Sequence, residues 1–477
     1  MEAVALPEGL TFIGDWAFGG CTGLMYINLP DSLTEMGENP FHNCPLGQVT
    51  WKENGLTYWR DRLLGADTDI VSATVREGVH YLGGGAFSGC IHLTEVSLPK
   101  WVTEIPSRCF ADSGLAAWRI PDSVTSIGEA AFAGCARLRE IVLPSGLTSI
   151  GYSAFEDCGQ LEIIAIPDGV TYIGPYAFSR CHRLRTVTLP AGLSALDTGL
   201  FFECGSLKEV YIPDSVTMID LHAFAGCGAL RGVVLPLGIN TIGAEAFANC
   251  LRLSDVNLPE SLLSVGANAF RNCPLRDASI KENGLTYWRG CVIGCDTNIT
   301  SAVIRAGTAK IGDSAFAGSE ILRSVDIPDS VTSVGQRAFS CCKNLRALTL
   351  PDSVTSIGQG FCEWCSCLES ICLSSGLDCI SESAFFDCES LTKAVLPAGI
   401  VRIKHHAFAR CGRLAEVILP PGLKYIGTNA FEDCQSLAVL DIPSTVTKIG
   451  GGAFRGTRLR KMLSERTAKK QWLKGKA

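Results

Sequence analysis

Cysteine is the residue type with the widest chemical repertoire in this chain, because thiolates bind metals and pairs of thiols form disulfides. Of the 23 cysteines among 477 residues, fifteen stand three positions after a recurring slot that is phenylalanine in all copies but one. Ser113, Ser319 and Thr457 replace this cysteine in the remaining copies. A slot that accepts these three types favours a small, buried side chain with weak hydrogen-bonding ability. We therefore predict a ladder of free thiols, since parallel side chains on neighbouring rungs are poorly oriented for bridging.

Two further groups of cysteines have spacings that suggest chemistry. Cys362, Cys365 and Cys367 are spaced like zinc ligands. They occupy different slots of a sequence repeat, however, and should point in different directions, so we expect no metal there. Cys291 and Cys295 stand outside the regular slots, in a segment where a β-hairpin is expected. A disulfide between these two is an alternative to free thiols.

No other constellation points to catalysis or to a cofactor. The histidines occupy unrelated slots of the repeat: His42, His80, His92, His182, His222, His405 and His406. The sequence contains no glycine-rich phosphate loop, no G-x-S-x-G nucleophile motif and no H-E-x-x-H metal motif. We therefore expect no enzyme activity, no catalytic residues, no cofactor and no metal.

These positions are set by a repeat of 23 residues. Residues 138–160 read LREIVLPSGLTSIGYSAFEDCGQ, and the next two stretches of equal length repeat the pattern L-x-x-V-x-L-P-x-x-V-T-x-I-G-x-x-A-F-x-x-C-x-x. Eighteen copies of the phenylalanine slot follow one another at intervals of 23 residues, with one interval of 22 and two of 46. A fixed period of this length is the signature of a stacked repeat architecture.

The pattern predicts the structure of one coil. L-x-x-V-x-L is rich in β-branched residues and predicts a short strand, which the following proline ends. V-T-x-I predicts a second extended piece, and A-F-x-x-C one helical or 3₁₀ turn that faces inward. A single coil cannot bury its apolar side, whereas a stack can. We expect a right-handed, β-rich superhelical solenoid of about 20 coils with a parallel concave sheet, forming one elongated domain over residues 1–459.

Two variant coils, residues 46–69 and 275–298, fill the intervals of 46. Both contain the string KENGLTYWR, and the two copies lie 229 residues apart. This distance corresponds to ten coils and suggests that a ten-coil block was duplicated. Asn-Gly pairs at Asn54-Gly55 and Asn283-Gly284, each flanked by strand formers, predict a β-hairpin that projects from the stack.

The unit in which Leu-Pro closes the strand and Ala-Phe-x-x-Cys closes the coil resembles the BspA-like (Treponema pallidum type, family 5) leucine-rich repeats. The resemblance extends from Met1 to about Leu459. It implies a curved solenoid of the kind found in bacterial surface proteins, and in some protist ones, that bind host or extracellular proteins. It also implies adhesion or recognition, and no common enzyme activity.

Charge is unevenly distributed along the chain. The formal charge is −7, but residues 455–477 contain nine Lys/Arg and one Glu, a local +8, so the remainder carries −15. An acidic body argues against nucleic acid as a partner, because that affinity comes from neutralised phosphates. No apolar run of 18 residues exists, so we expect no membrane span. For the basic end, residues 460–477, we expect an amphipathic helix that caps the last coil, with a cationic tail for membranes or nucleic acids as the alternative.

The residues that flank the central Val of the first strand should face the concave surface, the extended binding face of solenoids. In the middle of the stack they form an apolar strip with acidic and polar neighbours. An aromatic residue ringed by polar groups is typical of an interface core, although exposed strands also favour β-branched residues. The candidate binding surface consists of Glu140, Val142, Ile163, Ala165, Thr188, Glu209, Tyr211 and Val234.

These observations predict a non-catalytic protein-binding solenoid, from a bacterial surface or secreted adhesion module whose partner is a host or extracellular matrix protein. A cytoplasmic interaction scaffold and the binding part of an enzyme with its catalytic domain elsewhere are the alternatives. No signal peptide precedes the first coil, which begins in register at Met1. We therefore expect a fragment whose uncapped apolar end self-associates.

Overall fold

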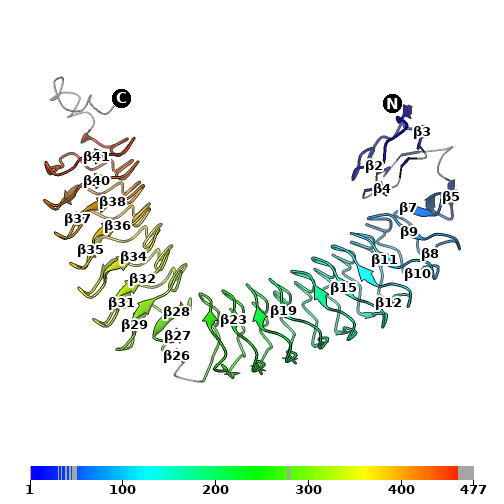
Figure 1. Cartoon of the computed structure of the whole chain (residues 1–477), viewed down its shortest axis with the longest axis horizontal. Coiled ribbons are helices and arrows are strands. Elements are labelled where there is room, and N and C mark those ends of the chain that lie inside the picture. The colour runs from blue at the N-terminus through cyan, green and yellow to red at the C-terminus, as the bar shows by residue number, and fades with distance from the viewer. Residues whose placement is uncertain are drawn as a thin grey trace. The chain divides into compact units, whose positions relative to one another are not determined.

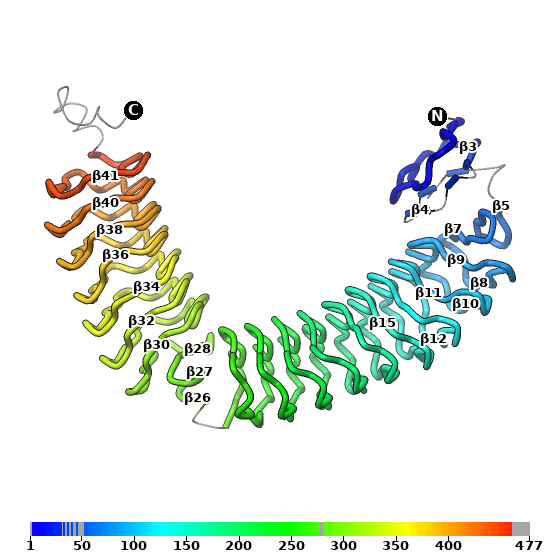
Figure 2. The backbone as a smooth tube through the Cα atoms, in the orientation of Figure 1, coloured from blue at the N-terminus to red at the C-terminus, as the bar shows by residue number. Residues whose placement is uncertain are grey.

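The computed structural model describes residues 2–30, 32–33, 35–37, 40–41, 44–45, 51–276 and 280–459. The expected cap or tail at residues 460–477 lies outside the described residues, as do the first residues of the first variant coil. The chain forms two compact units, Met1–Ser264 and Val265–Ala477. Within each unit the backbone winds through a regular series of coils (Figures 1 and 2).

Each regular coil contributes two short strands, except the last, which contributes only the second. In unit 1 the first strands are β1 (Ala3–Ala5), β3 (Tyr26–Asn28), β8 (Ser72–Thr74), β10 (Glu95–Ser97), β12 (Ala117–Arg119), β14 (Glu140–Val142), β16 (Ile163–Ala165), β18 (Thr186–Thr188), β20 (Glu209–Val210), β22 (Gly232–Val233) and β24 (Asp255–Val256). The second strands are β2 (Phe12–Ile13), β4 (Glu35–Met36), β9 (Tyr81–Leu82), β11 (Glu104–Ile105), β13 (Ser126–Ile127), β15 (Ser149–Ile150), β17 (Tyr172–Ile173), β19 (Ala195–Leu196), β21 (Met218–Ile219), β23 (Thr241–Ile242) and, at the unit boundary, β25 (Ser264–Val265).

Unit 2 repeats this arrangement. Its first strands are β29 (Ser301–Val303), β31 (Ser324–Asp326), β33 (Ala347–Thr349), β35 (Ser370–Cys372), β37 (Lys393–Val395) and β39 (Glu416–Ile418). Its second strands are β30 (Lys310–Ile311), β32 (Ser333–Val334), β34 (Ser356–Ile357), β36 (Cys379–Ile380), β38 (Arg402–Ile403), β40 (Tyr425–Ile426) and β41 (Lys448–Ile449).

Neighbouring coils pair in parallel with an offset of one repeat. Glu140 lies opposite Ile163, and Thr186 opposite Glu209, in the sheet β12-β14-β16-β18-β20. The second strands form their own parallel ladders, such as β11-β13-β15-β17. The predicted solenoid with a parallel sheet is confirmed, and the repeat length fixes the register because one period advances the chain by one rung.

The phenylalanine slots of consecutive regular coils form ring stacks in the core of each unit. Within unit 1 the rings of Phe132, Phe155 and Phe178 are all fully buried, with centroids 5.1 and 5.4 Å apart in near-parallel pairs. In unit 2 Cys362 fills the slot, and the adjacent Phe361 takes over the position. Its ring packs edge-on against its neighbours in the stack, with interplanar angles of 85° and 88°.

The prediction of a helical or 3₁₀ turn at A-F-x-x-C is wrong, since the described part of the chain forms strands and turns and no helical element. Ser153 and Asp157, on either side of Phe155, adopt left-handed φ angles of 50° and 58°. This alternation points backbone N–H groups along the stack. The amide of Phe155 donates to the carbonyl of Ala177 in the next coil at 2.8 Å. A helix would instead direct these N–H groups to carbonyls within the same coil.

The variant coils contain the expected hairpins, but these do not project from the stack. Each is a three-stranded antiparallel meander: β5 (Trp51–Glu53), β6 (Leu56–Trp59) and β7 (Arg62–Ala66) in the first coil, and β26 (Lys281–Glu282), β27 (Leu285–Trp288) and β28 (Cys291–Cys295) in the second. The last strand of each then pairs in parallel with the next coil's second strand. Tyr58 and Tyr287 are only 1% exposed, because the meander folds its apolar face into the core.

Candidate binding surface

The structure places all eight candidate residues on one face of unit 1, here called the first-strand face. β14, β16, β18, β20 and β22 carry them in or directly after the strand, on five consecutive coils. The central residue of each strand points inward and is buried, as Ile141 and Ile164 are, so its neighbours point outward. Sequence reasoning therefore identified the outward positions correctly.

The apolar members of this strip are strongly exposed. Val142 is 37% exposed, Ile163 61%, Tyr211 70% and Val234 74%. Glu140, Ala165, Thr188 and Glu209 are exposed beside them. Single exposed apolar residues are common on protein surfaces, but here they lie on two pairs of adjacent rungs, with Thr186 and Thr188 on the rung between the pairs.

A shallow hollow lies at the start of the strip. It has a volume of about 550 Å³ and is lined by Arg139, Glu140, Ile141, Val142, Leu143, Glu162, Ile163 and Ala165. Two carboxylates and one guanidinium surround an aliphatic floor. This combination suits an apolar side chain of a partner with a polar group at its edge.

The cysteine slot is a ladder of free thiols, as predicted. The Sγ atom of Cys181 donates to the carbonyl of Phe155 in the preceding coil at 3.2 Å, and Cys204 donates in the same way to Phe178 at 3.0 Å. Ser113, which occupies the same slot, lies 3.4 Å from the Sγ of Cys135. Most thiols of the ladder donate in this way to a backbone carbonyl of the preceding coil, which explains why small donors occupy this slot.

Burial suppresses the ionisation of Cys90 and Cys434, one ladder thiol in each unit. Desolvation raises the pKa of Cys90 and of Cys434 to about 12, because the thiolate would lose its hydration inside the stack. A thiol that stays protonated at neutral pH is a poor nucleophile and a poor metal ligand. The ladder is therefore a structural element of the coil.

The other cysteines are also unbridged. Cys291 and Cys295 are both free and stand on the same strand, β28, four residues apart. About 3.3 Å per residue separates them by roughly 13 Å, too far for a bridge, so the disulfide alternative is wrong. Cys362 and Cys365 are buried and free, while Cys367 is half-buried. Among the described residues no group of three or more His, Cys, Asp or Glu side chains is arranged to hold a metal ion.

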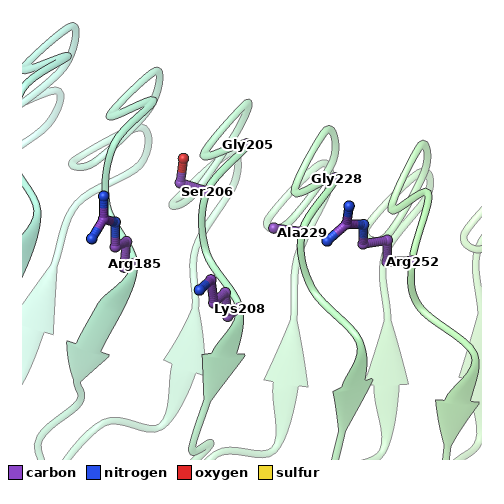
Figure 3. A pocket seen from close by; sticks show the side chains of 7 residues that line it. All are labelled: Arg185, Gly205, Ser206, Lys208, Gly228, Ala229 and Arg252. Carbon is purple, nitrogen blue, oxygen red and sulfur yellow. The ribbon is translucent and has the colours of Figure 1, made fainter.

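The residues that flank the central Val of the first strands did not reveal a second surface feature. Where unit 1 passes from each cysteine turn into the next first strand, a hollow of about 500 Å³ is lined by Arg185, Gly205, Ser206, Lys208, Gly228, Ala229 and Arg252. Figure 3 shows these residues on four consecutive coils, with the side chain of Arg252 extending toward Ala229. The signal in the sequence is the recurrence of Arg or Lys beside the first leucine of successive coils.

The described residues include no helix with the length and hydropathy that crossing a membrane requires. No curated protein matches the chain. Among solved structures, a leucine-rich repeat protein from Eubacterium ventriosum is similar at 23% identity over 76% of this chain and 86% of that one, with a TM-score of 0.50. This likeness shows the fold.

Two other solved structures are similar at lower TM-scores. A leucine rich cell surface protein from Faecalibacterium prausnitzii has 25% identity, covers 85% of this chain and 95% of its own, and gives a TM-score of 0.44. A leucine-rich repeat protein from Bacteroides ovatus has 27% identity, with coverage of 84% and 96% and a TM-score of 0.43.

The family described as BspA type leucine rich repeat region matches residues 1–117, 103–231, 217–295, 290–415 and 357–470. These stretches overlap and together cover nearly the whole sequence. Leucine-rich repeat proteins typically mediate protein–protein interactions, and such solenoids are generally non-catalytic. On the strength of a match from the first coil to the last, this chain belongs to the BspA type leucine-rich repeat family.

Proposed function

We propose that the chain is a non-catalytic recognition module of a bacterial surface or secreted protein, and that the first-strand face of unit 1 binds a host or extracellular matrix protein. The observation that carries the proposal is the set of exposed apolar residues Val142, Ile163, Tyr211 and Val234, which lie on four of five consecutive coils with Thr188 on the coil between. The resemblance to BspA-like repeats, which occur in adhesive surface proteins, supports the location.

The chemistry of the strip defines the partner. Tyr211 offers a large, rigid side chain that loses little conformational entropy on binding, which is typical of an interface anchor. Glu140 and Glu209 are exposed on the same face. The fitting partner therefore presents an apolar patch bordered by lysine or arginine side chains, since opposite charges at the rim of an interface favour association.

Substitutions on this face test the proposal. The partner for this test is an extracellular matrix protein that the immobilised chain retains. Tyr211→Ala should weaken the binding of that protein by about 2 kcal/mol, roughly thirtyfold in Kd. Val234→Asp should weaken it similarly, because it buries a carboxylate in the interface. Val303→Asp is the matched control, as it occupies the same slot on β29 in unit 2 and is 61% exposed. Equal binding by all three variants, with unchanged circular dichroism, would contradict this site.

A cytoplasmic interaction scaffold is the second candidate, favoured by the free cysteines that run through both units. Unbridged thiols are typical of reducing compartments. Fractionation of the native organism, with an antibody raised against the purified chain, separates the candidates. Recovery from surface washes or medium supports the recognition module, and recovery with the cytosol alone supports the scaffold.

The proposal includes self-association through the first coil. Val4, Leu6, Leu10 and Phe18 are only half-buried, whereas the same slots are buried in the middle of the unit. An apolar coil face of this kind favours stacking against a second copy. Sedimentation should show a concentration-dependent dimer that a polar capping coil fused before the first coil abolishes. A monomer at high concentration would exclude this contact.

A further inference from the structure

A row of cations follows one edge of unit 1, beside the first leucine of five of six consecutive coils. The twelve residues that flank Leu138, Leu161, Leu184, Leu207, Leu230 and Leu253 include seven cations and one anion, Glu162. We call this row the basic edge; its cations are Arg137, Arg139, Arg183, Arg185, Lys208, Arg231 and Arg252. A local charge of +6 stands out in a body that otherwise carries excess negative charge.

Two hollows lie on this edge. The larger one, about 500 Å³, has Arg185, Lys208 and Arg252 at its rim and small residues between them, with no carboxylate in its lining. The second, about 380 Å³, is lined by Ala116, Ala136, Arg137, Arg139 and Gln160. Both hollows therefore combine the same two elements, cations from the leucine-flanking slots and a floor of small side chains.

The small floor of the larger hollow is open to a ligand. Gly205, Ser206, Gly228 and Ala229 form it, and Figure 3 shows them between the cationic side chains. A side chain added at Gly205 would meet no neighbouring atom within 4 Å. A flat ring can therefore lie close to the backbone here, with the Ser206 hydroxyl within the lining to donate or accept a hydrogen bond.

The cations are available for an external anion. Lys208, Arg231 and Arg252 are exposed, and none of them has an ion-pair partner among the residues that the structure describes. Arg185 has one weak partner, Glu162, at 3.7 Å and in an exposed position. Stacked coils are about 4.8 Å apart, so Arg185 and Arg252, three coils apart, present positive charge over roughly 14 Å.

We propose that the basic edge binds a sulfated polysaccharide. Arginine donates paired N–H bonds to tetrahedral oxyanions, and a polymer with regularly spaced sulfates can engage cations on successive coils. The small floor fits sugar rings, whose hydroxyls match Ser206 and the exposed backbone. The larger hollow of the basic edge shares no residue with the first-strand face, and the proposal does not depend on the protein-binding proposal.

The lining favours a sulfated sugar over a nucleic acid. Single-stranded nucleic acids bind by stacking bases on aromatic side chains, and neither hollow has an aromatic residue in its lining. Glu140 and Glu209 also follow directly after cations of the edge, and would repel a continuous phosphate backbone. Discrete sulfates on a flexible sugar chain can avoid these carboxylates.

Binding of heparin, used as the probe, to the full chain provides the test. Calorimetry should show binding that weakens with salt and is lost with chemically desulfated heparin. Lys208→Gln combined with Arg252→Gln should weaken heparin binding about tenfold or more, since two charge-assisted contacts are removed. Ser206→Glu, which keeps every cation but places a carboxylate on the floor, should have a comparable effect.

The matched control is Arg323→Gln combined with Arg413→Gln, because in unit 2 these arginines follow and precede the first leucine of a coil, as Lys208 and Arg252 do in unit 1. It should leave the affinity within about twofold, as scattered surface charges contribute little at physiological salt. The basic end of the chain remains intact in all variants. Unchanged binding in the Lys208/Arg252 variant, equal losses in both double variants, or tighter binding of a single-stranded RNA than of heparin would each overturn the proposal.

Discussion

At the scale of single residues, the phenylalanine of each coil is held between the rings of its two neighbours. Phe178 lies with its ring centroid 5.4 Å from that of Phe155 and 5.8 Å from that of Phe201, and it is fully buried. Dense packing on both sides leaves little room for the structure to relax around a smaller side chain. Each phenylalanine therefore contributes apolar packing to its own coil and to both neighbouring coils.

Phe178→Ala should reduce the free energy of unfolding by about 3–5 kcal/mol, because it leaves a cavity in the stack. Urea denaturation followed by circular dichroism measures the change. Tyr172→Ala is the control, since Tyr172 is 51% exposed on β17, and it should cost about 0.5 kcal/mol or less. Equal costs for the two substitutions would show that the ring stack contributes little.

The buried thiols should lower the free energy of unfolding as the pH becomes alkaline. Burial raises the pKa of Cys90 and of Cys434 to about 12, from a value of 9.0 for an unperturbed thiol. Below pH 9 both the folded and the unfolded chain keep the proton, so stability is unaffected. As pH rises from 9 toward 12, only the unfolded chain releases it, and stability falls by up to about 1.4 kcal/mol per pH unit for each thiol.

Urea unfolding at pH 8, 9 and 10 checks this dependence. Replacing both residues, Cys90→Ser and Cys434→Ser, removes two titrating groups while keeping small donors, and it should flatten the decline. If the double variant loses stability between pH 9 and 10 as steeply as the parent, other groups cause the alkaline instability.

At the scale of elements, local sequence identified the strands but not the turns. Strand positions follow from β-branched residues and from the prolines that end them, which are properties of neighbouring residues. The A-F-x-x-C segment depends on partners 22 residues away, such as Ala177 for the amide of Phe155. Helix propensity considers only bonds inside the segment, so it could not reveal that these amides serve the next coil.

The sequence predicted that the variant coils contain hairpins with a two-residue turn, but it did not predict that the hairpins pack into the core. Asn283 and Gly284 adopt φ angles of 50° and 79°, as the two-residue turn requires. Burial of Tyr287 depends on β28 joining the ladder of the following coil, a contact that the local pattern does not encode. The same lack of pairing information left Cys291 and Cys295 open to a disulfide interpretation.

The two variant coils share an ion pair that differs in burial, which allows a matched comparison. Lys281 and Asp296 lie 2.6 Å apart with side chains 7% and 15% exposed, whereas Lys52 and Asp67 lie 2.6 Å apart and are 56% and 42% exposed. Lys281→Met should cost about 3 kcal/mol or more, because it leaves a buried carboxylate without its cation.

Lys52→Met should cost about 1 kcal/mol or less, since water screens an exposed pair. Denaturant unfolding of both variants gives the comparison. If Lys52→Met reduces the free energy of unfolding as much as Lys281→Met does, the contribution of the ion pair does not depend on its burial.

At the scale of the whole molecule, the repeat length is the quantity that the structure depends on most. Removing residues 161–183 deletes one 23-residue coil and joins Gln160 to Leu184, so every slot stays in register. We expect this variant to keep the parent's circular dichroism spectrum per residue and to lose only the stability of one coil and its interface.

Deletion of residues 161–172 is the contrasting variant. It shifts all later slots by half a coil and places outward residues at inward positions, so we expect a loss of ordered structure. Equal folding of the two variants would show that coils form independently of the phase of the repeat.

The same whole-molecule regularity explains which surfaces sequence reasoning could find. Outward positions of the strand follow from alternation, so the exposure of Val142, Ile163 and Tyr211 was predictable. The basic edge was not anticipated, because its cations are spread over five of six consecutive coils and no short window of sequence shows them together. They become a cluster only when residues 23 positions apart are brought side by side.

The hydrogen bonds that join each coil to the next have a mechanical consequence. They run along the axis of the stack, as that from Phe155 to Ala177 does, so a force applied along this axis opens them one after another instead of shearing them together. Each detached coil would release 23 residues, or about 75 Å of extended chain. A surface-tethered stack of this kind would lengthen in small steps at modest force, and so remain attached to its partner while the tether stretches.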